Sequence, residues 1–163
     1  MITEQKGMGE RYNMNIAFFL TPKSEVIYEN INSSMRQVLE RMEFHRYTAV
    51  PIIDDKGRYV GTITEGDLLW KLKSTLGLNI KDTSSIKVSD IERRTVNKPV
   101  SINADMENLL SLAVNQNFVP VTDDEGIFIG IIKRSDIINY FYNYVVNLEG
   151  EILLKETVSM DSK

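Results

Sequence analysis

The stretch VPIIDDKGRYVGTITEGDLL, residues 50–69, decides the fold because it recurs further along the chain. Residues 119–138 read VPVTDDEGIFIGIIKRSDII and align with it without a gap at an offset of 69. Eight of the twenty positions are identical, among them Pro51 and Pro120, Gly61 and Gly130, and Asp67 and Asp136. Self-similarity at a fixed offset is typical of repeated structural units. The sequence therefore predicts two related units that share one architecture.

An amphipathic helix is expected ahead of each copy of this stretch. Apolar residues at i, i+3, i+4 and i+7 indicate one buried helix face. Two stripes have this spacing: Met35, Val38, Leu39 and Met42, and then Met106, Leu109, Leu110 and Ala113. Asparagine is a favoured helix N-cap, and Asn32 and Asn103 stand three residues ahead of the stripes. We expect these two asparagines to cap the helices.

A hairpin should follow each of these helices. The segments DDKG, residues 54–57, and DDEG, residues 123–126, are turn sequences between apolar runs, which predicts antiparallel strand pairs. The expected strands are 49–53 with 59–64 and 118–122 with 128–132, and second helices are expected around 68–72 and 137–142. Gly61 and Gly130 lie inside strand patterns, where glycine indicates a bulge or a close approach by backbone or ligand. Recurrence in both copies favours the close approach.

The composition is that of an ordinary globular protein. The chain has 163 residues, of which 42% are hydrophobic and 26% charged, and it contains no cysteine. Its net charge of −4 argues against general nucleic-acid binding, which needs a basic surface. No apolar run reaches the roughly eighteen residues that a membrane span requires. We therefore expect a soluble, cytoplasmic protein.

Pattern and composition divide the chain into five parts. A polar N-terminal segment covers residues 1–15, and the first unit covers 16–75. A linker rich in Ser, Thr, Lys and Asp covers 76–87, and the second unit covers 88–146. Residues 147–163 are expected to form a tail, with a short apolar cluster followed by polar residues.

The repeated pattern resembles a tandem pair of cystathionine β-synthase (CBS) domains, often called a Bateman module. The resemblance covers about residues 16–144 and depends on the motifs VPIIDDKG…GTITEGD and VPVTDDEG…GIIKRSD. It implies an α+β fold, in which two β-α-β-β-α units related by a pseudo-twofold axis pack sheet to sheet. It also implies clefts that bind AMP, ADP, ATP, S-adenosylmethionine or cyclic di-AMP, and modules that often pair into disc-like dimers.

The motif TEGD, residues 64–67, is the first candidate site. By itself a threonine followed three residues later by an aspartate is a helix capping box. In the family that the chain resembles, these two residues contact the ligand, and the aspartate accepts hydrogen bonds from both ribose hydroxyls. Thr64 and Asp67 match that pattern in full. The cap and the ligand contact are compatible, so both roles are expected.

The second copy keeps Asp136 but carries Lys133 and Arg134 where the first has Thr64 and Glu65. Two cations in the first turn of a helix oppose its macrodipole, and a solvated helix end is the simplest reading. A helix N-terminus with basic side chains also attracts anions. Our hypothesis is that Lys133 and Arg134 contact the phosphates of a nucleotide. Because this copy lacks the hydroxyl, one functional cleft is expected.

The resemblance also implies which residues surround the base. Residues just ahead of each motif proline, largely through their backbone, and the strand leading into each unit should line the adenine pocket. These residues are Thr48, Ala49, Val50, Phe118 and Val119, together with Leu20, Ile91 and Arg93. Tyr47 has the chemistry to stack on a base, although an aromatic residue beside a buried strand is equally expected in the core.

Other functions have less support. No nucleophile has a visible base beside it and no metal-ligand spacing occurs, so we expect neither an enzyme nor a metal site. No helix-turn-helix segment for DNA binding is visible. A stripe of Ile138, Phe141, Tyr142 and Val145 favours self-association. We expect a stand-alone sensor that binds an adenosine-containing ligand, forms a homodimer and acts on a protein target. The alternative is a ligand-free scaffold for protein association.

Overall fold

The computed structural model describes residues 14–160, and it describes their side chains up to residue 147. The first unit contains the elements β2 (Glu29–Asn30), α1 (Met35–His45), β3 (Ala49–Ile53), β4 (Tyr59–Thr64) and α2 (Glu65–Ser74). The second contains β5 (Val100–Ser101), α3 (Met106–Ala113), β6 (Phe118–Thr122), β7 (Phe128–Lys133) and α4 (Arg134–Met160). Residues 16–25 form η1 (Ile16–Phe19), β1 (Leu20–Pro22) and η2 (Lys23–Glu25), and η3 (Ile80–Ser85) and η4 (Val88–Asp90) lie between α2 and β5.

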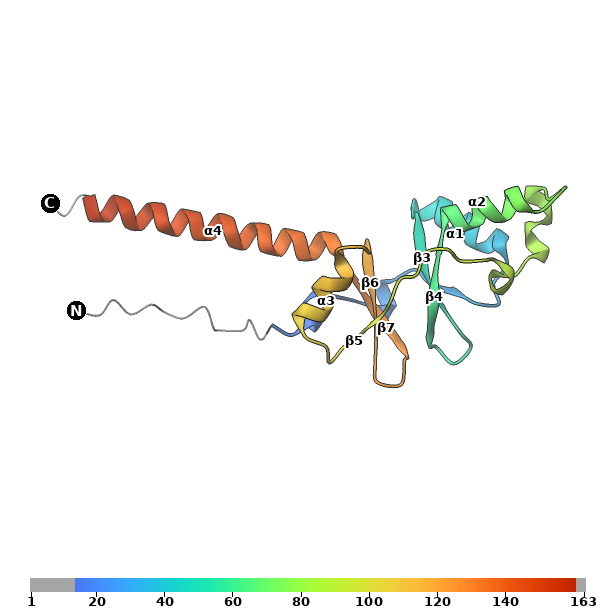
Figure 1. Ribbon diagram of the computed structural model, residues 1–163, viewed down its shortest axis with the longest axis horizontal. Coiled ribbons are helices and arrows are strands. Elements are labelled where there is room, and N and C mark those ends of the chain that lie inside the picture. Colours follow the sequence, from blue (N-terminus) through green and yellow to red (C-terminus); the bar gives the residue numbers. More distant parts are fainter. Residues whose placement is uncertain (1–13, 161–163) are drawn as a thin grey trace.

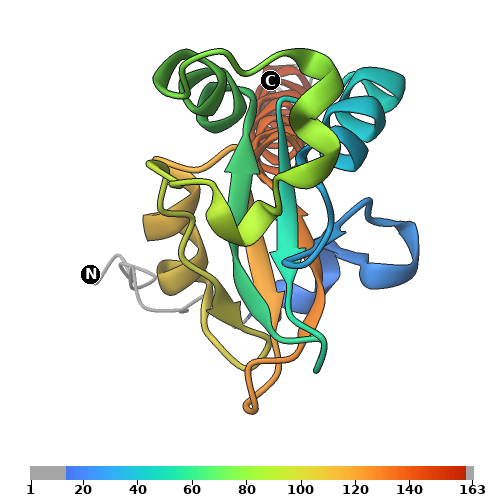
Figure 2. The ribbon, with the colours of Figure 1, turned by 90° about the vertical axis from the view of Figure 1, so that its right-hand side faces the viewer.

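The two sheets lie side by side in the middle of the molecule, with α1 and α2 on one side and α3 and α4 on the other (Figures 1 and 2). One sheet has the strand order β2-β3-β4 and the other β1-β7-β6-β5. Both hairpins are antiparallel, as the repeat predicts, and each is joined by a parallel strand from ahead of its first helix. The α+β fold of two packed units is therefore confirmed.

Strand β1 lies in the segment expected to be the first unit, residues 16–75, but it pairs with the second unit. Leu20 pairs with Ile132 and Pro22 with Gly130, in antiparallel register. The Thr21 carbonyl oxygen lies so close to Gly130 that a Cβ atom there would approach it to 2.2 Å. The close approach expected at Gly130 is thus a backbone contact with β1.

The helix caps differ from those expected. Ser34 caps α1 by accepting a hydrogen bond from the Gln37 N–H, and Asp105 caps α3 by accepting one from the Asn108 N–H. The expectation that Asn32 and Asn103 are the caps is wrong, because a capping side chain must reach the amides of the first helical turn. Asn32 instead donates to Asp55 at 3.0 Å, and Asn103 donates to Asp124 at 3.2 Å. Both asparagines therefore hold the hairpin turns.

Each unit has its own apolar core, and a third cluster joins the two units. Met35, Val38 and Ile63 are fully buried in the core of the first unit, and Leu109, Val119 and Ile132 are fully buried in the core of the second. A smaller cluster of Val26, Ile53 and Phe128 lies between the sheets. Burial of a side chain of this size contributes roughly 1.5–3 kcal/mol, so these clusters supply most of the stabilisation.

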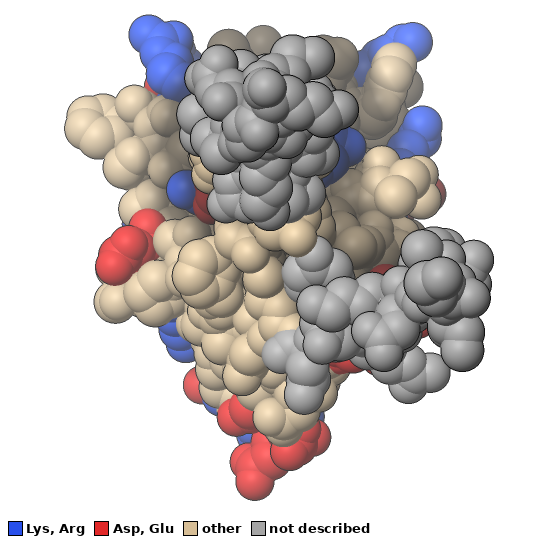
Figure 3. All heavy atoms as spheres, turned by 90° about the vertical axis from the view of Figure 1, so that its left-hand side faces the viewer, with Lys and Arg blue, Asp and Glu red and all other residues tan. Residues whose placement is uncertain are grey.

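The two hairpin turns bind each other through their main chains. The Tyr59 N–H donates to the Gly126 carbonyl at 3.1 Å, and the Phe128 N–H donates to the Gly57 carbonyl at 2.9 Å. The turns also carry acidic side chains, Asp54, Asp55, Asp123, Asp124 and Glu125. Acidic side chains gather at the lower end of the molecule in Figure 3, where the turns lie in Figure 1, and lysines and arginines gather at the upper end.

Helix α4 extends far beyond the second sheet (Figure 1). It runs from Arg134 to Met160, so most of the segment expected to be a tail from residue 147 is helical. None of the helices in the described part of the chain is long and apolar enough to cross a membrane. The N-terminal segment expected at residues 1–15 lies outside the described residues except for its last two.

Candidate functional site

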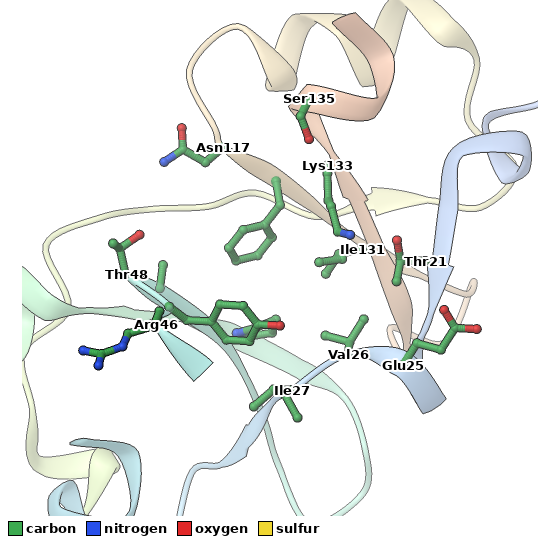
Figure 4. Close-up of a pocket in the computed structure, with 14 residues that line it drawn as sticks. Thr21, Glu25, Val26, Ile27, Arg46, Thr48, Asn117, Ile131, Lys133 and Ser135 are labelled. Carbon is green, nitrogen blue, oxygen red and sulfur yellow. The ribbon is translucent and has the colours of Figure 1, made fainter. Parts of the chain in front are cut away.

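A pocket of about 310 Å³ lies between the two units (Figure 4). One wall comes from the end of α1 and from β3, and the other comes from β6, β7 and the start of α4. Thr21 of β1 and residues 25–27 close the third side. We call this the inter-unit pocket. Because it draws residues from both copies of the repeat, a molecule bound in it would contact both units at once.

Five of the residues expected to bind ligand line this pocket. They are Tyr47, Thr48, Ala49, Phe118 and Lys133. Tyr47 is 43% exposed, and its ring stacks on the ring of His45, with centroids 5.5 Å apart and planes 14° apart. Tyr47 is therefore a pocket-wall aromatic rather than a core residue, and its free face is suited to stacking on a planar base.

The sequence did not indicate the other lining residues. Four come from one segment of the chain, Thr21, Glu25, Val26 and Ile27, and the rest are Arg46, Pro51, Asn117, Ile131 and Ser135. The first four follow Leu20, which was expected to contribute, so pairing of β1 with β7 was the missing information. Arg46 and Asn117 lie in loops that carry no motif.

Lys133 is the cation that extends into the pocket. Its side chain points from the end of β7 toward Ile131 and Thr21 (Figure 4). The side chain is exposed. The Arg46 guanidinium points away from the pocket, and the carboxylate of Glu25 lies on the far side near Thr21 (Figure 4). The hypothesis that Lys133 faces a phosphate therefore has a suitable geometry.

Arg134 and Asp136 do not line the inter-unit pocket. The Arg134 guanidinium donates to the Asn117 side-chain oxygen, and its main-chain N–H donates to the Asn117 carbonyl at 3.0 Å, so this arginine holds the loop before β6. Asp136 is partly buried and accepts a hydrogen bond from the Ser135 hydroxyl at 3.4 Å. It lines an adjacent hollow with Leu20 and Thr21, and Thr21 also lines the inter-unit pocket.

The first copy of the motif forms the expected capping box of α2. The Thr64 N–H and hydroxyl both donate to Asp67 Oδ2, at 2.9 and 2.7 Å, and the Asp67 N–H donates to Thr64 Oγ1 at 3.2 Å. The Arg94 N–H occupies the other carboxylate oxygen at 2.9 Å. Asp67 is only 2% exposed. Both of its oxygens are thus bound by the chain itself, whereas Asp136 faces a hollow.

The remaining expected residues are distributed between the core and a second hollow. The side chains of Val50, Val119 and Ile91 belong to the apolar cores, which leaves only their main chains for a ligand. Arg93 packs beside Gly61 and lines a hollow with Tyr59 and Thr62. Its Nη1 atom is buried and has no hydrogen-bond partner among the described residues.

Burial raises the pKa of Tyr59, in the same hollow, to about 12. Its hydroxyl donates to the Asn97 carbonyl at 2.8 Å and lies 2.9 Å from Thr62 Oγ1. A phenol ionises near pH 10 in the unfolded chain. Between pH 10 and 12 the unfolded state therefore loses a proton that the folded state retains, and stability falls as the pH rises.

Tyr59→Phe should remove this loss of stability between pH 10 and 12. At pH 7 the variant is expected to be about 1 kcal/mol less stable, because the Asn97 carbonyl loses its donor. The difference in the free energy of unfolding between the variant and the parent protein should become smaller as the pH rises above 10. Urea unfolding from pH 7 to 11 measures it, with Tyr142→Phe at an exposed tyrosine as the control. A difference that stays constant with pH would contradict the assignment.

A comparison with known protein families matches the two copies of the repeat separately. The model of the CBS domain matches residues 19–74 and 88–143, together more than half of the chain. The chain belongs to the CBS domain family. Its two units are a CBS pair, and the Thr64–Asp67 and Lys133–Asp136 segments lie at equivalent positions of the repeat, one in each matched region.

Relatives of this CBS pair are distant. An uncharacterized protein of Methanopyrus kandleri, MK0525, is 25% identical over 130 residues, which are 80% of this chain and 65% of that protein. The chloroplastic CBS domain-containing protein CBSX2 of Arabidopsis thaliana is 25% identical over 144 residues, 74% of this chain and 60% of that protein. The CBS pair therefore spans less than two thirds of the length of these curated relatives.

Solved structures share the CBS-pair fold. CBSX2 in complex with AMP is 25% identical with a TM-score of 0.62, and the match covers 80% of this chain and 97% of that one. CbpB in complex with c-di-AMP is 21% identical with a TM-score of 0.74, and that match covers 85% of this chain and 91% of the other. The second likeness shows the fold alone.

Proposed function

We propose that this CBS pair is a regulatory protein that binds an adenosine-containing ligand, AMP, ADP, ATP or cyclic di-AMP, in the inter-unit pocket. The observation that carries the proposal is the pocket itself, where Tyr47 and Phe118 from the two units face a space into which Lys133 extends. The AMP complex of CBSX2 and the c-di-AMP complex of CbpB support an adenosine ligand. The ligand is regulatory, and no catalytic step is assigned.

Different residues would contact the base, the phosphate and the ribose of the ligand. The base would lie against Tyr47, Ala49 and Phe118, where ring faces and β-strand main chain offer stacking and hydrogen bonds. Lys133 would bind phosphate as a point charge. Asp136 lies beyond Thr21, and its carboxylate is suited to accept hydrogen bonds from ribose hydroxyls.

The ribose contact expected at Asp67 stays a prediction for a second cleft. Asp67 Oδ1 accepts a hydrogen bond from the Arg94 N–H at 2.9 Å, and a carboxylate oxygen can accept a second one. The side chain is only 2% exposed, so the residues that cover it would have to move before a ribose could reach it. We therefore propose that the inter-unit pocket, which contains Lys133, binds the ligand more tightly than the cleft at Asp67.

A thermal-shift panel tests the proposed function. AMP, ADP, ATP, cyclic di-AMP and S-adenosylmethionine would be compared with GMP as the control. A ligand at 100 times its Kd adds about 2.7 kcal/mol, which corresponds to roughly 5–11 °C for a domain of this size. At least one adenosine compound should raise Tm by this amount while GMP does not. If all the adenosine compounds leave Tm unchanged, the proposal is wrong.

A ligand-free scaffold is the second candidate function. Helix α4 presents Ile138, Tyr142 and Val145 to solvent, with 58%, 66% and 50% exposure. Exposed apolar residues in one patch are typical of protein–protein contact. We propose that the protein acts in the cytoplasm on a protein target in either case, and the two candidates differ in whether a nucleotide controls that contact.

A further inference from the structure

The carboxylate of Asp67 is covered, whereas the equivalent carboxylate of Asp136 is not. Each is the third residue of its helix and occupies the same position of the repeat. Asp67 is 2% exposed. Asp136 lines a hollow of about 430 Å³, and the one hydrogen bond that its side chain accepts among the described residues comes from the Ser135 hydroxyl at 3.4 Å. The difference therefore comes from what lies against each helix start.

In the first copy, the chain that follows η4 lies against the start of α2. The Arg94 N–H donates to Asp67 Oδ1 at 2.9 Å. Four residues earlier, the Asp90 carbonyl accepts a hydrogen bond from the Lys71 ammonium at 3.1 Å. Residues 90–94 are thus fixed to α2 at both ends. We call them the covering segment, because their main chain occupies the side of the Asp67 carboxylate that the capping box leaves free.

The Arg94 side chain makes a second contact with α2, at the indole ring of Trp70. Its guanidinium lies 5.7 Å from the ring centroid, and the Lys73 ammonium lies 5.1 Å from it. The ring extends back toward the start of the helix, since a Cβ atom added to Gly66 would have Trp70 Nε1 at 3.9 Å. A cation beside the face of a tryptophan is attracted by the quadrupole of the ring. Arg94 therefore binds Asp67 through its main chain and Trp70 through its side chain.

The second copy has neither half of this cation–indole contact. Asn139 stands at the position equivalent to Trp70, at the offset of 69, and it offers no aromatic face. Lys23 is equivalent to Arg94 at the offset of 71, which is the offset that aligns β2 with β5. The Lys23 ammonium lies 5.1 Å from the centroid of the Tyr28 ring. The cover over the helix start is therefore a feature of the first copy.

We propose that Arg94 keeps the cleft at Asp67 closed and thereby makes it the weaker of two ligand sites. The contact between the guanidinium and Trp70 stabilises the position in which the Arg94 N–H binds Asp67 Oδ1. A ribose reaches that carboxylate only when the covering segment moves away. The apparent affinity of the cleft is then reduced by the fraction of chains that are open. The closure depends on contacts within the chain, whereas its effect on ligand affinity rests on the proposed function.

Amide hydrogen exchange tests the closure without any ligand. Arg94→Ala removes the cation, and Trp70→Asn introduces the residue type of the second copy. Each should lower the exchange protection of the residue-94 amide by roughly two- to fivefold, the effect expected for loss of one cation–π contact. The double variant should lose no more than either single one, since both remove the same contact.

Lys73→Ala is the matched control for this experiment. It removes the other cation from the same ring and leaves the covering segment unchanged, so protection at residue 94 should stay as in the parent protein. Unchanged protection at residue 94 in both Arg94→Ala and Trp70→Asn would overturn the inference, and so would an equal loss in Lys73→Ala.

NMR titration with AMP tests the effect on affinity. The residue-94 amide reports the cleft at Asp67, and the Ser135 amide reports the inter-unit pocket. In Arg94→Ala and Trp70→Asn, the AMP Kd read at residue 94 should fall by the same factor as the protection, and the Kd read at Ser135 should not change. If AMP binds at neither place, the proposed function fails for AMP and amide exchange alone decides the closure. If AMP binds at Ser135 but no more tightly at residue 94 in the variants than in the parent protein, the effect on affinity is wrong although the sensor function stands.

Discussion

Gly130→Ala is expected to destabilise the fold by about 3 kcal/mol or more. Its Cβ atom would lie 2.2 Å from the Thr21 carbonyl oxygen and 2.8 Å from a Leu20 methyl group, so β1 would have to move away from β7. Overpacking of this kind costs roughly 1–3 kcal/mol, and a non-glycine residue in an unfavourable backbone conformation costs a similar amount. Calorimetry should show a Tm lower by roughly 6–12 °C.

The repeat supplies matched controls for this variant. Gly61 is the equivalent glycine in the first copy, with a φ of 143°, but its Cβ would meet only the Arg93 guanidinium at 3.4 Å. Because a flexible side chain can move, Gly61→Ala should destabilise the fold by about half as much as Gly130→Ala. Gly66→Ala, inside α2, should be neutral or stabilise by up to about 1 kcal/mol. Equal losses at Gly130 and Gly61 would show that backbone strain, and not the contact with β1, sets the cost.

Lys133→Ala is expected to weaken binding of phosphorylated adenosine compounds by roughly 10- to 100-fold. A hydrogen bond to a charged group contributes about 1.5–3 kcal/mol, and Lys133 is the cation that extends into the inter-unit pocket. Adenosine itself lacks the phosphate and should bind the variant as well as it binds the parent protein. Isothermal titration calorimetry with AMP and adenosine gives both affinities.

Two further variants make this result specific. Lys133→Arg keeps the charge and should retain most of the affinity for AMP. Lys133→Thr introduces the residue type found at the equivalent position 64 of the first copy, and this variant should bind AMP as weakly as Lys133→Ala does. An equal loss for adenosine and AMP would place Lys133 against the base or sugar. Unchanged AMP affinity in Lys133→Ala would mean that the phosphate lies elsewhere.

The repeat predicted the fold closely because it depends on local patterns. Strands β3, β4 and β6 have the expected bounds, since each is an apolar run limited by an Asp-Asp-x-Gly turn or by a helix start. The pairing of β1 with the distant β7 could not be predicted in this way, because three residues carry no periodicity. The caps were misplaced since asparagine serves turns as well as helix starts.

The sequence predicted the pocket residues that lie in or beside the motif strands. It did not predict those that reach the pocket only through the placement of the strands and loops in the fold. Thr48, Ala49 and Phe118 adjoin the motif prolines, and they line the pocket. Arg134 has the right charge, but its bond to Asn117 could not be foreseen because that partner is seventeen residues away in a loop. Arg46 could not be predicted because it follows α1 in a loop without a motif, and only the folded chain brings it to the pocket.

The reciprocal main-chain bonds of the hairpin turns have a mechanical consequence. Gly57 and Gly126 tie the two sheets together at one end of their strands, whereas Thr48 and Lys133 lie at the opposite ends of β3 and β7. A rotation of one sheet against the other about these turns would displace the opposite ends of the strands most, where Thr48 and Lys133 line the inter-unit pocket. Such a rotation would change the width of the inter-unit pocket without breaking the main-chain bonds between the turns.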